Sequence, residues 1–195
     1  MQIFRRTFGM YMPNGTPDKT NSPSPHYAPG ELGCSFVDQN TGCAYLRAQL
    51  DSGATSATAT GAVVANQLAY WKDESQIIVT NDKNQCDAGP SGAINRVAGV
   101  FQTAVTAAPG VNGTDGNPVM YLCDLLIRGR SRKVQAASAL IGAQATADTS
   151  SNVARAVYTT GVNTAPVSQI LGIFASSTID SSNNALVDVA IGFAE

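Results

Sequence analysis

Two stretches of the chain repeat one pattern of apolar and small residues. Residues 96–105 and 169–178 both read apolar, any residue, glycine, apolar, phenylalanine, any residue, serine or threonine, with the glycines at Gly99 and Gly172. A glycine inside an apolar strand marks a bulge or the close approach of a neighbouring backbone. The recurrence predicts two copies of one β unit. The alternative is chance similarity between strands rich in alanine, glycine and valine.

An alternating segment follows each of these stretches after a polar turn region. Residues 119–127 alternate less cleanly than residues 185–193. In the latter, the apolar side chains share one side of a strand: Ala185, Val187, Val189, Ile191 and Phe193. A period of two marks a strand with one buried face. Two such units indicate a duplicated small barrel or sandwich.

The rest of the body also reads as short strands joined by turns, at residues 60–72, 76–80 and 155–159. Two segments are ambiguous. Residues 43–50 form either one limb of a hairpin or a short helix, and residues 134–147 form either a pair of strands or a helix. The regular spacing of turn signals favours a mainly β fold, a compact β-barrel or β-sandwich.

The 195 residues fit one body preceded by an arm. Residues 1–33 carry prolines between aromatic residues, which predicts an extended arm lying on another surface, with a solvated terminus as the alternative. Residues 34–195 form the β body, with two similar lobes as repeat units at about 60–134 and 135–195. The arm offers aromatic and basic side chains as contacts with a partner: Phe4, Arg5, Arg6, Phe8, Tyr11 and Tyr27.

The composition changes the expected surface. Charged residues make up only 13% of the chain, against about 25% in typical globular domains. Small and uncharged polar residues must therefore cover the surface, as is common in proteins that work packed into an assembly. The net charge of −2 gives no general case for nucleic acid or an anionic membrane as the partner.

The sequence also predicts the cellular compartment and the redox state of the cysteines. The first ten residues lack the apolar core of a secretory signal, and no apolar run reaches the roughly 18 residues of a membrane helix. We therefore expect a soluble protein made in a cytosol. Free thiols are the default for its four cysteines there, and a Cys34–Cys43 bridge is the alternative.

Residues that carry chemistry are sparse. His26 is the single histidine and lies in the arm, whereas a catalytic base needs a rigid position and an orienting partner. The chain has no nucleophile elbow, phosphate loop or zinc-binding helix motif. The cysteines lack metal-ligand spacing, and residues 81–87 lack the glycine and glutamate of a calcium loop. We expect no catalytic residue, no cofactor and no metal.

The one dense charge feature is basic. Arg128, Arg130, Arg132 and Lys133 supply four of the twelve basic residues. If the strand continues, its alternation puts the three arginines on one face. They form either a solvated strand end or a contact with an acidic partner. A protein is favoured over nucleic acid as that partner because the chain as a whole is not basic.

The tandem units resemble the small decoration (cement) proteins of tailed-phage capsids. The likeness lies in Ala98-Gly-Val-Phe, in Leu171-Gly-Ile-Phe and in the closing Val187-Asp-Val-Ala-Ile, and it covers roughly residues 60–195. The low-charge composition agrees with it. The proline-rich arm departs from the compact members of that family, which begin almost directly with the barrel.

The resemblance implies a structural virion protein without enzymatic activity. Such a protein binds the major capsid protein on the outside of the head, often as a homotrimer, after assembly in the host cytoplasm. Two other classes stay open. One is another virion component, such as a head-fibre base or a tail protein. The other is a carbohydrate-binding β module, for which Tyr70 and Trp71 with Asp73 are the nearest approach to an aromatic rim.

Overall fold

The computed structural model describes residues 33, 35–50, 63–82, 96–104, 121–148, 155–159 and 170–191, which form ten strands and no helix. The strands are β1 (Ser35–Val37), β2 (Ala44–Leu50), β3 (Leu68–Asp73), β4 (Ile78–Thr80), β5 (Val97–Phe101), β6 (Tyr121–Gln135), β7 (Gln144–Ala147), β8 (Ala156–Thr159), β9 (Ile170–Phe174) and β10 (Asn184–Ala190). All ten belong to one sheet. The mainly β fold expected from the sequence is confirmed.

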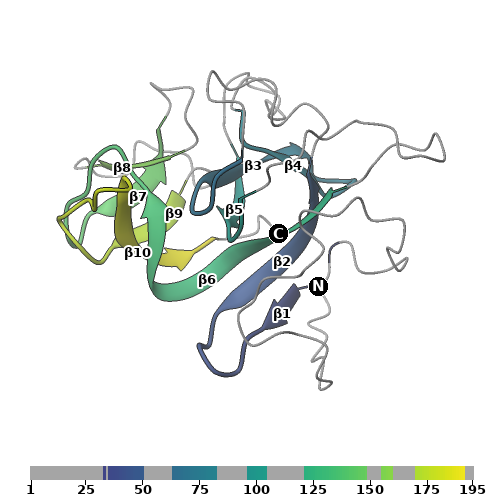
Figure 1. Cartoon of the computed structure of the whole chain (residues 1–195), viewed down its shortest axis with the longest axis horizontal. Coiled ribbons are helices and arrows are strands. Elements are labelled where there is room, and N and C mark those ends of the chain that lie inside the picture. The colour runs from purple at the N-terminus through teal and green to yellow at the C-terminus, as the bar shows by residue number, and fades with distance from the viewer. Residues whose placement is uncertain are drawn as a thin grey trace.

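Five of the strands close on one another and form what we call the first ring (Figure 1). β2 pairs with β6, β6 with β5, β5 with β3 and β3 with β4, all antiparallel. A short parallel pairing of β4 with β2 completes the ring. β1 adds to β2 by an antiparallel pairing.

A second ring shares β6 with the first. The antiparallel order runs from β6 through β10, β9 and β7 to β8. A parallel bridge between Ala136 and Ala156 closes it, and the Ala137 N–H donates to the Ala156 carbonyl at 2.8 Å. In Figure 1, β6 curves from the first ring on the right to the second ring on the left.

The two rings follow one pairing scheme. The strands of the first ring follow the order β4-β3-β5-β6, and those of the second follow the equivalent order β8-β7-β9-β10. The remaining strand, which comes first in the chain and pairs with both ends of that order, is β2 in the first ring and β6 in the second. The registers also agree: Ala69 lies opposite Gly99, Ala145 lies opposite Gly172, and a register shift follows directly in both. The two similar lobes and their boundaries at about 60–134 and 135–195 stay a prediction.

The glycine of the repeated pattern has the same structural role in both rings, because in each a neighbouring strand lies very close to it. Gly172 has a φ of 153°, which L residues rarely adopt, and a Cβ there would collide with the Asp188 carbonyl of the neighbouring β10. A Cβ at Gly99 would meet the Leu125 side chain of the neighbouring β6. Only glycine lets the following strand approach this closely.

Two clusters of buried apolar side chains hold the molecule together. One draws on all five strands of the first ring, with Trp71 and Phe101 among its largest members. The other fills the second ring and continues onto the outer side of the first ring through residues such as Tyr70 and Leu126. The second ring therefore packs against the wall of the first.

The structure settles both segments that the sequence left ambiguous. Residues 44–50 are strand β2, and residues 134–147 contain the end of β6 and all of β7, with no helix. β6 does not stop at Ile127 as expected but continues to Gln135, because its second half pairs with β10. The predicted arm lies outside the described residues except for Gly33.

Candidate functional site

The basic residues lie where β6 passes from one ring to the other. Arg128 is the turning point, since it pairs with Ala44 of β2 on one side and with Ala190 of β10 on the other. We call residues 128–133 the basic segment. The chain brings its densest positive charge to the junction of the rings because β6 serves both of them.

A β-bulge interrupts the pairing inside the basic segment. Gly129 pairs with Val189 and Arg132 with Val187, so Arg130 and Ser131 together oppose Asp188 alone. Ser131 has a φ of 49°, and its N–H donates to Oδ1 of Asp188 at 2.7 Å. An extra residue in one strand reverses the alternation of side chains beyond it.

The bulge overturns the expectation that the three arginines share one face. Arg128 and Arg130 are exposed. Arg132 pairs with the buried Val187 and therefore lies on the buried face, where it is half-buried. Its Nε has no hydrogen-bond partner among the residues that the structure describes. Lys133, one residue further on, is exposed again.

The charges of the basic segment are only partly balanced. Nζ of Lys133 lies 3.1 Å from Oδ2 of Asp180. Within the described ranges, neither Arg128 nor Arg130 forms an ion pair. The Arg132 charge lies near Asp38 and helps to lower the pKa of that carboxyl, after the larger effects of hydrogen bonds from the Thr41 hydroxyl and the Asn40 N–H.

The sequence reasoning missed a set of exposed aliphatic side chains on the second ring. The set comprises Leu140, Ile141, Ile173, Ile179 and Leu186. Two hydrogen bonds tie the loops that carry it: the Ile141 N–H donates to Oγ of Ser177, and the Leu186 N–H donates to Oγ of Ser176. The outward position of Leu186 in the alternation of β10 was the one signal available.

The remaining polar groups are built into the fold. Arg47 and Asp124 form a buried ion pair, with Nε 2.9 Å from Oδ1. Burial raises the pKa of the Cys123 thiol, so this free cysteine is unreactive at neutral pH. The part of the chain that the structure describes holds no group of three acidic, histidine or cysteine side chains able to bind a metal.

Two further observations bear on function. Tyr70 and Trp71 are 1% and 5% exposed, so they belong to the cores and form no sugar-binding rim. Among the described elements there is no helix long and apolar enough to cross a membrane. The six contact candidates of the arm, Phe4, Arg5, Arg6, Phe8, Tyr11 and Tyr27, lie outside the described residues.

Comparison with protein-family models, curated proteins and solved structures finds no match.

Proposed function

We propose that this chain is a structural protein of a tailed-phage virion that binds the outer surface of the capsid and stabilises the shell. The observation that carries the proposal is the matched place of β5 and β9 in two rings of one pairing scheme. These strands contain the two glycine-phenylalanine stretches on which the resemblance to decoration proteins rests.

The distribution of polar groups agrees with a binding role. Two buried carboxylates pair within the fold, Asp124 with Arg47 and Asp148 with Arg155. Chemistry needs groups that converge on a substrate instead. We therefore propose a protein that acts through its surface and without a cofactor, and that is not an enzyme.

The major capsid protein is the proposed partner, together with further copies of this chain in a homotrimer. The exposed guanidinium groups of Arg128 and Arg130 face acidic groups of that partner. The arm of residues 1–33 adds a second contact. Several weak contacts per assembly raise the overall affinity by avidity, since one low-charge patch binds weakly on its own.

The structure bears differently on the two alternative functions, another virion component and a carbohydrate-binding module. A head-fibre base or a tail protein has the same requirements for fold and surface. A carbohydrate-binding module loses its nearest support because Tyr70 and Trp71 are buried.

Co-sedimentation tests the proposal. Purified protein is mixed with capsids that lack it and is centrifuged through a cushion, with an unrelated protein of similar size as the control. We expect the chain to pellet with the capsids and to raise the temperature at which they rupture. Protein left in the supernatant at concentrations up to about 100 μM, where even weak contacts of about −5 kcal/mol are partly occupied, overturns the proposal.

A further inference from the structure

The first ring closes through a short ladder between β4 and β2. Two residue pairs form it, Gln49 with Ile78 and Leu50 with Val79. The Gln49 N–H also donates to the Ile77 carbonyl at 3.0 Å. Leu50 and Val79 are 2% and 0% exposed and belong to the buried cluster inside this ring. The first ring is therefore closed both by backbone pairing and by apolar packing.

The second ring closes with less pairing and less packing. Among the described residues, its closure consists of the bridge between Ala136 and Ala156 and the hydrogen bond from the Ala137 N–H to the Ala156 carbonyl. We call this closure the seam. The side chains of the bridged pair are single methyl groups, which bury much less apolar surface than a leucine and a valine. The seam is therefore the weaker of the two closures.

Hydrogen bonds show which residues of the two rings correspond. The Phe101 N–H donates to the Gln67 carbonyl, and the Phe174 N–H donates to the Ala143 carbonyl, both at 2.9 Å. The strand registers around these two phenylalanines agree as well. Counting along the paired strands then gives each inward position of the first ring a counterpart in the second.

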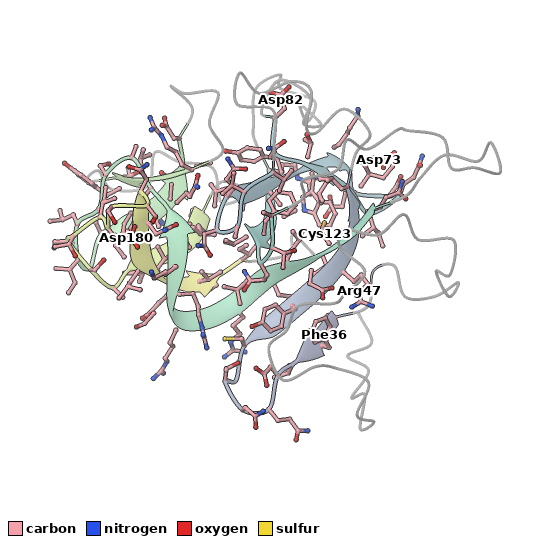
Figure 2. All side chains as sticks on the ribbon, in the orientation of Figure 1. Phe36, Arg47, Asp73, Asp82, Cys123 and Asp180 are labelled. Atoms are coloured by element: carbon pink, nitrogen blue, oxygen red, sulfur yellow. The ribbon has the colours of Figure 1, made fainter. Side chains whose placement is uncertain are left out.

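The inward positions of the second ring hold smaller side chains. Four of them are Leu50, Trp71, Val79 and Cys123 in the first ring, and Ala136, Ala147, Ala156 and Ala185 in the second. In Figure 2, Cys123 is labelled within the first ring. Ala48 and Ala98 reverse the trend, since their counterparts are Val134 and Leu171. Those two gains are smaller than the loss at the tryptophan position alone.

The two buried clusters repeat this asymmetry. The cluster inside the first ring consists only of residues of that ring. The buried side chains of the second ring instead share a cluster with Leu68, Tyr70 and Val100, which lie on the outer side of the first ring. The first ring thus keeps its own core if the second opens, whereas the second loses part of its core if the first unfolds.

We propose that the second ring opens at the seam while the first ring stays closed. Opening separates β8 from the end of β6 and disturbs the second ring without breaking the cluster inside the first. Partial opening of this kind is common where one cooperative unit has fewer buried contacts than another. The inference concerns the free protein and does not depend on what the chain binds.

Hydrogen exchange of two matched amides tests the proposal. The N–H groups of Phe101 and Phe174 form equivalent bonds of 2.9 Å, and the two residues are 0% and 1% exposed. They differ mainly in the ring to which they belong. NMR of the full chain, corrected for intrinsic rates, is expected to show the Phe174 amide exchanging about tenfold faster or more. Equal protection of the two amides overturns the inference.

A disulfide across the seam tests where the ring opens. Bridged residues on neighbouring strands lie within disulfide reach, and Ala136 and Ala156 belong to one buried cluster. In the double variant Ala136→Cys with Ala156→Cys, oxidation should slow exchange of the Phe174 amide to the rate of the Phe101 amide. The same variant with its thiols reduced is the matched control and keeps the faster exchange. Fast exchange in the oxidised chain contradicts opening at the seam.

A matched pair of substitutions tests the order of opening. Phe174→Leu and Phe101→Leu each remove part of one buried ring from equivalent places. We expect the first variant to speed exchange at position 174 and to leave position 101 unchanged. The second variant should speed exchange at both positions, because the second ring relies on the first. An equal effect of Phe174→Leu at both positions contradicts the proposal, and capsid binding is measured separately.

Discussion

At the scale of single residues, Asp180 controls the turn before β10. Its Oδ1 accepts hydrogen bonds from the N–H groups of Asn184 and Ser182, at 2.8 and 2.9 Å. The Asn184 bond is the largest effect that lowers the pKa of Asp180, to about 2, and the Lys133 contact adds to it. The carboxylate therefore binds its proton less readily in the folded chain than in the unfolded one.

This predicts a pH dependence of stability. A lowered folded-state pKa stabilises the fold fully above the ordinary value of 3.8, and this contribution is lost as the pH falls toward about 2. We expect an NMR titration of the Asp180 carboxyl to have its midpoint near 2, and Asp180→Asn to remove part of the acid dependence of unfolding. A midpoint at the ordinary value would show that the turn does not hold the carboxylate.

Gly172 gives a second prediction at this scale. Gly172→Ala forces a side chain into a strained backbone conformation and against the Asp188 carbonyl. We expect a loss of about 1–3 kcal/mol from backbone strain, and more from the collision. Urea denaturation measures it.

Gly142 provides the matched control for that substitution. Its φ of 79° is also positive, but a Cβ there meets nothing within 4 Å. Gly142→Ala therefore carries only the backbone cost, about 1 kcal/mol. Equal losses at the two glycines would contradict the close-approach account.

At the scale of elements, β6 decides which basic residues reach a partner. The bulge at Arg130 and Ser131 turns Arg132 to the buried face and leaves Arg128 and Arg130 outward. Reversing the charge of the outward pair, Arg128→Glu with Arg130→Glu, is expected to weaken capsid attachment. The effect is larger at low salt, where screening is least.

The conservative variant is the control for charge. Arg128→Lys with Arg130→Lys keeps both positive charges, and we expect it to retain most of the binding. Co-sedimentation at two salt concentrations measures all three proteins. If the charge-reversed variant attaches normally at low salt, the basic segment is not part of the contact with the capsid.

The alternation of apolar residues was a sound guide to single strands. In β10 it identified Ala185, Val187 and Val189 as the buried face, and all three are buried. The glycine-phenylalanine stretches likewise predicted two strands, and both form. These features can be predicted locally, because successive residues of a strand point to opposite faces of the sheet.

What the sequence did not reveal depends on contacts between distant segments. Nothing in residues 128–135 indicates that β6 will be shared by two rings, since that follows from its pairing with β10. The bulge depends on Asp188, which lies far along the chain. The misplacement of Arg132 followed from assuming unbroken alternation, and a single extra residue is enough to reverse it.

At the scale of the whole molecule, one pairing scheme occurs twice in the described strands. It gives two rings that share β6. Our proposal for this molecule is that it makes repeated contacts with a shell of many identical copies.

Cryo-electron microscopy of the virion tests this account most directly. We predict density for the two rings on the outer surface of the head, repeated at equivalent positions of the capsid lattice, with the basic segment of residues 128–133 facing the shell. Density confined to the tail or to a single vertex, or a head surface without this molecule, would contradict it.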